Sequence, residues 1–492
     1  MARALRVDPG DSVATLLDDV HSGETVQVGA FAVTASADIQ RGHKIALQPI
    51  AAAAPVLKYG FPIGRATAAI AAGEHVHAHN LATGLAGTLA YRFDPTPAAP
   101  ILPAAPATFD GYVRADGRVG TRNEIWILST VGCVARTAER IATRAAALVG
   151  DTVDGVHAFT HPHGCSQLGN DLDGTRTIMA SLACHPNAGG VLIVGLGCEE
   201  NQIKALMATI PPERHAMIRT MTTQLSGDEV EEGCALVAEL AALAATPRTT
   251  VGLDRLVLGV KCGGSDGLSG LTANPLVGRM SDRVTAAGGR AVFTEIPEVF
   301  GAEQLLMNRA ADTGVFDRIV DVVNDFKQYF IDHGEPVSEN PSPGNVAGGI
   351  TTLEEKSLGA VQKAGRATVS DVIGYGQRIT QDGLTMLEAP GNDAVSSTAL
   401  AAAGATAILF TTGRGTPLGF PVPTIKIASN SDLAQRKPGW IDFDAGAVLV
   451  DGFPAAEDAL LARIMAVASG AETAAERNGE REIAIWKRGV TL

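Results

Sequence analysis

The chain has 492 residues, of which 39 are Lys or Arg and 53 are Asp or Glu, giving a formal net charge of −14 at pH 7. Hydrophobic residues make up 46% and charged residues 19%, a composition that indicates a folded globular protein and excludes intrinsic disorder. The acidic balance argues against a nucleic-acid partner and against an anionic membrane surface, both of which require a basic face.

The sequence also bears on where the protein works. No apolar segment typical of a secretory signal follows the first residues, and apolar runs such as 191–196 are too short to span a bilayer. The six cysteines include no CxxC pair and are too sparse for a disulfide framework. We therefore expect a cytoplasmic protein whose cysteines are core thiols, metal ligands or catalytic groups.

Residues 1–93 predict a small β-rich domain. Short apolar runs separated by glycine-containing turns predict strands over 25–28, 44–47 and 75–79. A helix is expected over 13–17, with Ser12 as its cap. Residues 94–107 contain five prolines and predict an extended linker.

Beyond the linker, apolar strands alternate with helical stretches. Strands are expected over 124–130, 155–160, 190–194, 256–260 and 291–294. Helices are expected over 135–149, 203–208 and 275–287, with another beginning near 301. After a Pro/Gly/Asn-rich break at 334–349, strands resume at 369–373, 384–387, 407–410 and 424–427. This alternation predicts an α/β multidomain fold in which the β-rich domain precedes parallel-sheet (Rossmann-like) domains over 108–366 and 367–492.

Four cysteines each follow a predicted strand and lie in a glycine-containing turn: Cys133, Cys165, Cys198 and Cys262. Ligands of open α/β sheets bind at the carboxyl ends of the strands, so these thiols could meet at one sheet edge. Thiolates suit iron or zinc, and three thiolates with one open position suit a substrate-binding iron centre. A cysteine in an apolar segment is also commonly a small buried hydrophobe, and that interpretation stays open for each.

Polar groups gather at the same turns. His161 precedes Cys165, Glu199 follows Cys198, and Ser265 with Asp266 follows Cys262. Glycine-rich turns after strands present backbone N–H groups that can hold a carboxylate. Glu199 is equally explained as an acid at the N-terminus of a helix, where the dipole favours it.

Three further segments carry candidate binding or catalytic groups. GRVGTRNE supplies Arg118, Arg122 and Asn123, and the strand end near 410 is followed by Arg414, Lys426 and Asn430. An arginine in such a position can donate two parallel hydrogen bonds to the two oxygens of a carboxylate. Alternatively, these residues lie in a solvated loop and form surface ion pairs. His79 belongs to HAHN (77–80), where two histidines on one strand face could bind a metal or act as acid and base, unless that face is simply polar.

Long motifs spread along nearly the whole chain resemble those of the altronate and galactarate dehydratases. They are RADGRVGTRN (114–123), THPHGC (160–165), HPNAGG (185–190), GLGCE (195–199), CGGSDGLSGLTANP (262–275), NPSPGNVAGGITTLEEKSLGA (340–360) and FTTGRGTP (410–417). The first domain resembles the SAF domain of these enzymes, with GHKIAL (42–47) and VHAHN (76–80) as markers. HAHN and GTRN look more like the altronate branch.

The resemblance implies a hydro-lyase that uses ferrous iron, with manganese as a substitute and a labile iron–sulfur cluster as an alternative. Its reaction would convert D-altronate to 2-dehydro-3-deoxy-D-gluconate and water. The alternative functions are those of a galactarate dehydratase and a sulfolactate sulfo-lyase. A non-enzymatic iron or sugar-acid sensor has less support. The expected partner is a small sugar acid, and a homodimer is the common state of such enzymes.

Dehydration of a 2,3-dihydroxy acid needs a base for the proton next to the carboxylate, positive charge for the enediolate, and an acid for the leaving hydroxyl. We expect iron to be held by some of the four strand-end cysteines, with His161 or His79 as the base. Glu199 and Asp266 would transfer protons or orient a ligand. The substrate would be bound by Arg118, Arg122, Asn123, Ser265, Arg414, Lys426 and Asn430.

Overall fold

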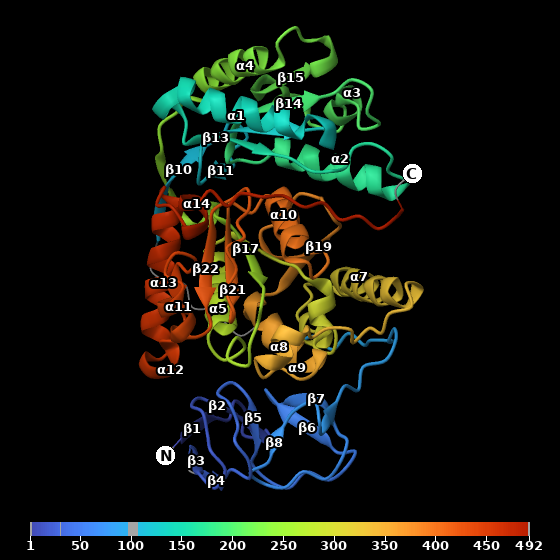
Figure 1. The fold of residues 1–492 in the computed structure, drawn as a ribbon, viewed down its shortest axis with the longest axis vertical. Helices are drawn as coiled ribbons and strands as arrows, with labels where there is room; N and C mark the ends of the chain where they lie inside the picture. The colour runs from blue at the N-terminus through green and yellow to red at the C-terminus, as the bar shows by residue number, and fades with distance from the viewer. Residues whose placement is uncertain (1, 30, 97–106, 491–492) are drawn as a thin grey trace.

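The computed structural model describes residues 2–29, 31–96 and 107–490, and it arranges them in three layers along the long axis of the molecule (Figure 1). The N-terminal β domain lies at one end, a seven-stranded sheet with its helices lies in the middle, and a four-stranded sheet with its helices lies at the other end. The predicted α/β fold with a β-rich first domain is confirmed. No helix in the described ranges is long and apolar enough to cross a membrane.

The N-terminal domain holds a six-stranded sheet in the order β4-β3-β1-β2-β5-β8 and a three-stranded sheet in the order β6-β7-β9. The bounds are β1 Ala2–Leu5, β2 Val13–Leu16, β3 Thr25–Val28, β4 Phe31–Thr34, β5 Lys44–Ala46, β6 Pro55–Lys58, β7 Phe61–Ala66, β8 His75–Val76 and β9 Leu81–Ala82. The short elements and glycine turns that the sequence predicted are therefore present, although one differs in kind and one in length.

The helix expected over 13–17 is wrong, because this segment is strand β2. All four of its residues are buried between β1 and β5, and two of them, Val13 and Thr15, are β-branched. Ser12 does not cap a helix: its hydroxyl accepts a hydrogen bond from the backbone N–H of Leu57. The strand expected over 75–79 is also too long, since β8 ends at Val76 and HAHN forms a turn in which Asn80 accepts from the backbone N–H of His77.

The predicted proline-rich linker falls mostly on residues 97–106, which lie outside the described residues. Just before them, the backbone N–H of Thr96 bonds the carbonyl of Asn308, so the chain leaves the N-terminal domain along the middle layer. Just after them, β10 (Thr108–Val113) pairs with β11 (Val119–Gly120) and β16 (Thr249–Gly252) in a small antiparallel sheet.

The second domain is built on a parallel sheet in the order β13-β12-β14-β15. Its strands are β12 Glu124–Ser129, β13 Gly155–Phe159, β14 Ala188–Gly195 and β15 Ile218–Thr222, and its helices are α1 Ala135–Val149, α2 Asn170–Ala183, α3 Ile203–Met207 and α4 Glu229–Ala244. Strand alternation sends Ile125 and Ile127 into the core with α1 and α4, while Trp126 and Leu128 enter the core with α2.

The middle layer is a parallel sheet in the order β19-β20-β18-β17-β21-β22-β23. Its strands are β17 Val257–Cys262, β18 Arg290–Phe293, β19 Val369–Ile373, β20 Gly383–Leu387, β21 Ala407–Thr412, β22 Thr424–Ala428 and β23 Phe443–Asp444. Because β17 and β18 pair with strands that follow residue 366, the boundary predicted at 366/367 runs through this sheet and does not separate two domains. Sequence alternation alone does not show which strands share a sheet.

Helices cover both faces of the middle sheet (Figure 1). They are α5 Ala273–Ala286, α6 Glu303–Met307, α7 Thr313–Asp332, α8 Pro343–Ala347, α9 Leu353–Ala360, α10 Asp393–Ala403, α11 Ser431–Arg436, α12 Val448–Asp451, α13 Phe453–Ala468 and α14 Ala474–Arg477. Helix α10 packs on both α2 and β17, so it joins the middle layer to the second domain.

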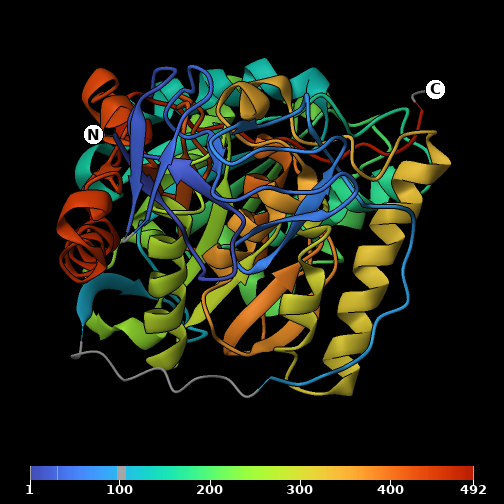
Figure 2. The ribbon, with the colours of Figure 1, turned by 90° about the horizontal axis from the view of Figure 1, so that it is seen from below.

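The carboxyl ends of the middle strands point toward the N-terminal domain (Figure 1). One hydrophobic cluster includes Val56 and Ile63 of that domain together with Leu258 of β17, so the two parts share a core. Viewed from this end, the N-terminal domain lies in front of the middle layer and leaves the long helix α7 uncovered (Figure 2). The edge at which α/β sheets bind ligands is therefore partly closed by the N-terminal domain.

Candidate active site

Three glycine-rich segments interlock where the N-terminal domain meets the middle sheet. The backbone N–H of Gly267, after β17, bonds the carbonyl of Gly348, and the side-chain amide of Asn345 bonds the carbonyl of Ser265 at 2.8 Å. Gly349 has φ +98°, and a Cβ there would collide with the carbonyl oxygen of Gly42. Only glycine fits this contact, which fixes the N-terminal domain against the strand ends.

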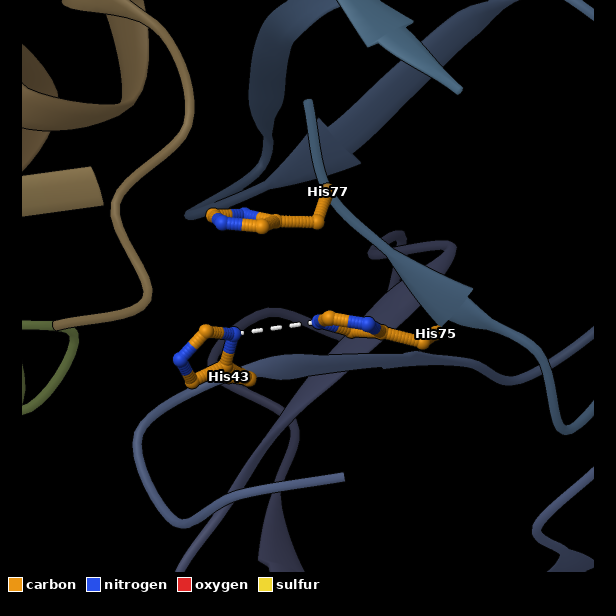
Figure 3. A group of neighbouring side chains, drawn as sticks. All are labelled: His43, His75 and His77. Atoms are coloured by element: carbon orange, nitrogen blue, oxygen red, sulfur yellow. Dashed lines mark hydrogen bonds between the residues drawn. The ribbon is translucent and has the colours of Figure 1, made fainter. Parts of the chain in front are cut away.

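Three histidines of the N-terminal domain meet beside this contact (Figure 3). His43 comes from the turn before β5, and His75 and His77 come from β8 and the turn after it. One ring nitrogen from each lies within 4.8 Å of the others, and His43 Nδ1 is 3.0 Å from His75 Nε2. His79 is exposed, with its ring centroid 5.5 Å from that of His75. Thus His79 lies at the edge of the histidine cluster, which consists of His43, His75 and His77.

Burial keeps the histidine cluster uncharged. Desolvation lowers the pKa of His75 to about 3 and that of His77 to about 4, and it lowers the pKa of His43 as well. The Nε2 atom of His43 is buried and has no hydrogen-bond partner among the described residues. The cluster therefore consists of neutral imidazoles.

A buried ionic triad lies next to the histidine cluster. Glu355 accepts hydrogen bonds from Lys44 Nζ at 2.8 Å and from Lys58 Nζ at 2.9 Å, and Lys44 also donates to the carbonyl of Gly349 and to Thr351. Burial alone would raise the pKa of Glu355, but the two ammonium groups lower it to about 2. Two ammonium groups share one carboxylate, so the triad is locally positive although the chain is acidic.

Asp266 is close to this edge, but its carboxylate is fully used by the protein. Oδ1 accepts from the backbone N–H of Leu268, from Ser269 and from the hydroxyl of Ser429, and Oδ2 accepts from the side-chain amide of Asn430. Asn430 also caps α11 through Leu433 N. Both predicted residues thus hold the strand ends in place.

The other predicted residues of this edge differ in their exposure. Ser265 is buried, and its carbonyl accepts from Asn345. Lys426 is fully buried in β22, where it donates to the carbonyl of Pro417 and where burial lowers its pKa to about 8. Arg414 is exposed, unlike Ser265 and Lys426. Its stem lies against Gly264, and its guanidinium is exposed to a ligand.

Cys262 ends β17 and lies in a closed cluster of charges. Its sulfur is 2.7 Å from Lys363 Nζ and 3.3 Å from a Glu298 oxygen, while Glu295 pairs with both Lys363 and Lys261. Burial raises the pKa of the Cys262 thiol to about 12. Lys261 and Lys363 already pair with Glu295, and Lys356 pairs with Glu298, so any cation bound here would lie beside three ammonium groups.

The prediction that four cysteines meet at one sheet edge is wrong. Cys133, Cys165 and Cys198 are exposed at the carboxyl edge of the four-stranded sheet, whereas Cys262 belongs to the seven-stranded sheet. The first three lie on loops joined by the bonds Gly132 N to His163 O and Asn201 N to Gly164 O. In the described part of the chain they do not form a three-residue group with ligand atoms within 4.8 Å of one another.

His161 and Glu199 also belong to the second domain and not to the histidine cluster. His161 is 4% exposed, and burial lowers its pKa to about 4. Glu199 is buried, and its carboxylate accepts from the hydroxyl of Thr130 and from the backbone N–H of Gly197. Desolvation opposes ionisation of Glu199, but these bonds lower its pKa. Glu199 thus holds the loop that carries Cys198.

The GRVGTRNE residues join domains instead of facing the strand ends. Arg122 is 4% exposed, forks onto Glu476 at 2.9 and 3.0 Å, and also bonds three backbone carbonyls. Asn123 bonds Arg114 and the carbonyl of Ala244. Arg118 pairs with Asp116 and lines a cavity that also contacts Leu256, at the amino end of β17. All three lie away from the edge where Arg414 lies.

Sequence reasoning did not single out His75, Lys58 or Glu355. His75 immediately precedes HAHN, and Glu355 lies in the motif at 340–360, but nothing in the sequence shows that residues 43, 75 and 355 come together. Glu355 is preceded by the helix cap Thr352, which accepts from its backbone N–H. This cap begins α9 and sets the direction in which Glu355 projects toward Lys44.

Family models match three consecutive stretches of the chain. The altronate/galactarate dehydratase SAF domain matches residues 2–84, and the second domain of D-galactarate dehydratase/altronate hydrolase matches residues 111–245. The C-terminal model of D-galactarate/altronate dehydratase matches residues 253–491. Together these models cover both sides of the contact that carries the histidine cluster.

Full-length relatives give the same assignment. The chain is 50% identical to altronate dehydratase of Escherichia coli (strain K12) over 99% of both chains, and 47% identical to altronate dehydratase of Bacillus subtilis (strain 168) over 100% of both. It is 34% identical to galactarate dehydratase (L-threo-forming) of Escherichia coli (strain K12), covering 90% of this chain and 88% of that enzyme.

Proposed function

The chain belongs to the altronate and galactarate dehydratase family, and we propose that it is a hydro-lyase that converts D-altronate to a 2-keto-3-deoxy acid and water. The observation that carries this proposal is the identity of 50% and 47% to two altronate dehydratases over the whole chain. Galactarate dehydratase is more distant at 34%, so altronate is favoured over galactarate as the substrate.

The site has groups that suit an anionic sugar acid. The positive triad of Lys44, Lys58 and Glu355 lies behind the histidine cluster, and Arg414 is exposed at the end of β21. An arginine fork matches a carboxylate, and local positive charge stabilises the enediolate that forms when the neighbouring carbon loses its proton. We assign Arg414 to the substrate carboxylate.

Proton transfer needs an accessible base. His79 is exposed beside the histidine cluster, whereas His161 is buried in the second domain, so His79 is the better candidate. In this scheme His79 takes the proton from C2, and the C3 hydroxyl leaves with a proton as water. The C2–C3 enol then tautomerises, so that C2 becomes a ketone and C3 gains a proton. Ferrous iron, for which manganese is a substitute, is the proposed cofactor and would supply Lewis acidity to the leaving hydroxyl.

The same proposal places the enzyme in the cytoplasm. All six cysteines are free, and three of them are exposed on neighbouring loops, an arrangement that a reducing compartment preserves.

A substrate panel tests the proposal. The protein is purified without oxygen, loaded with ferrous iron, and assayed for 2-keto-3-deoxy acid with altronate, galactarate, galactonate and sulfolactate. We expect altronate to have the largest kcat/KM, by about tenfold or more over galactarate. If the protein prefers galactarate, it is still a dehydratase but altronate is not its main substrate. Sulfite release from sulfolactate without any turnover of altronate would refute the proposal.

A further inference from the structure

We propose that His43, His75 and His77 form a binding site for one first-row divalent metal ion. The site is inferred from the arrangement of these three side chains, and only the choice of iron as the physiological ion rests on the proposed function. No cysteine belongs to this site, so it differs from the thiolate centre that the sequence suggested.

The spacing of the nitrogens suits a single ion. Metal–imidazole bonds are about 2.0–2.1 Å long, so two nitrogens on one ion lie roughly 3–4 Å apart. The three ring nitrogens all lie within 4.8 Å of one another, and His43 Nδ1 and His75 Nε2 are 3.0 Å apart. His43 and His75 point ring nitrogens at each other, and the ring of His77 stacks over that of His75 (Figure 3).

The three rings are partly withdrawn from solvent, since His43 is buried and His75 and His77 are half-buried. The nitrogens that approach each other are His43 Nδ1 and His75 Nε2, whereas His43 Nε2 points away from His75.

Neighbouring groups orient the ligands in the way that metal sites require. Thr351 Oγ1 is 2.9 Å from His77 Nδ1, which leaves the other nitrogen of His77 directed to the cluster. Asn80 bonds the backbone N–H of His77 and the carbonyl of His75, which fixes the turn between them. Such partners set the ring orientation and the tautomer of a histidine ligand.

Three protein ligands leave positions open for the substrate. His75 and His77 are half-buried, so one side of the cluster reaches solvent. A metal held by these histidines would supply Lewis acidity to a hydroxyl of the sugar acid. Because Lys44 is paired with Glu355, its charge beside the ion is partly compensated. The anionic substrate would compensate the rest, so metal and substrate should stabilise each other.

Cobalt(II) binding to the full-length protein tests the site with a spectroscopic readout. Apo protein is titrated with Co²⁺ without oxygen, and both the stoichiometry and the absorption spectrum are measured. We expect one tightly bound Co²⁺ per chain, with weak visible bands and no intense thiolate-to-metal charge transfer. Because this measurement uses the unaltered chain, it does not depend on whether any variant folds.

Variants then locate the ion. His75→Ala should weaken Co²⁺ binding by on the order of 100-fold or more, because it removes a direct ligand. His21→Ala, an exposed histidine of the same domain, and Cys165→Ala should bind as the parent does. Circular dichroism shows whether each variant is folded.

Two results would overturn the inference: intense thiolate charge transfer in the parent, or loss of the metal in Cys165→Ala with retention in His75→Ala. The proposed function is refuted by a different result. If the protein binds Co²⁺ through these histidines but does not turn over altronate, the metal site stands and the proposed reaction is wrong.

Discussion

Removing the carboxylate of Glu355 is the perturbation whose effect can be worked out most fully. Glu355→Gln keeps the shape of the side chain but leaves Lys44 and Lys58 buried without a counter-charge. The pKa of Glu355 is about 2, compared with an ordinary value of 4.5. At ~1.36 kcal/mol per pH unit this difference corresponds to about 3 kcal/mol of stability. Removing one partner of a buried ion pair costs about 3–5 kcal/mol, so this figure agrees with the loss of stability obtained from the pKa.

The pKa of Glu355 also predicts how the stability difference between the parent and Glu355→Gln changes with pH. Because the pKa of Glu355 is lower in the folded protein, its contribution is complete above the unfolded value of 4.5 and is lost as the pH falls toward 2. Urea unfolding followed by circular dichroism should therefore show the variant less stable by about 3 kcal/mol at pH 7, with a smaller gap at pH 4.

Lys44→Met is the matched control, because it leaves Glu355 with one partner, Lys58, and should destabilise the protein less than Glu355→Gln. Equal stability of the parent and Glu355→Gln at pH 7 would refute the reasoning, as would a gap that widened toward acid.

Three further substitutions test the site. Arg414→Gln should lower kcat/KM for altronate by about 10- to 100-fold, mainly through KM, because a charge-assisted contact to a carboxylate is worth about 1.5–3 kcal/mol; an unchanged KM would remove Arg414 from the site. His79→Gln should lower kcat by about 10²- to 10⁴-fold with an unchanged melting temperature, since the side chain is exposed; full activity would exclude it as the base. Gly349→Ala should cost about 1–3 kcal/mol from backbone strain plus the collision with Gly42. Gly479→Ala, which also has a positive φ but has open space around its Cβ, should cost less, and equal losses would show that the contact with Gly42 is unimportant.

The sequence was a good guide to the parallel sheets and a poor guide to which strands share a sheet. Buried parallel strands are continuous apolar runs, so segments such as 190–194 and 407–410 were recognised. The run at 13–17 is too short for its periodicity to separate helix from strand, and its buried pairing with β1 and β5 decides the outcome. The continuity of β17 with β21 across residue 366 depends on contacts between distant segments, which no local pattern records.

For the site, the sequence identified the correct kind of residue but often the wrong environment. Arg122 and Asp266 stand in loops that look suited to ligand binding, yet their hydrogen-bonding groups are used inside the protein. Conversely, His43 and His75 lie 32 residues apart in two turns of a small β domain, and only its folding places their nitrogens 3.0 Å apart. The predicted homodimer and the identity of the metal stay predictions.

The central claim is that this chain dehydrates altronate across C2 and C3. It is tested most directly by following the reaction of D-altronate in D2O by NMR with the iron-loaded protein. The account predicts a single 2-keto-3-deoxy acid that carries one deuterium at C3, because the enol formed by loss of water is protonated from solvent at that carbon. Unchanged altronate, or a product that keeps the oxygen at C3, would contradict it.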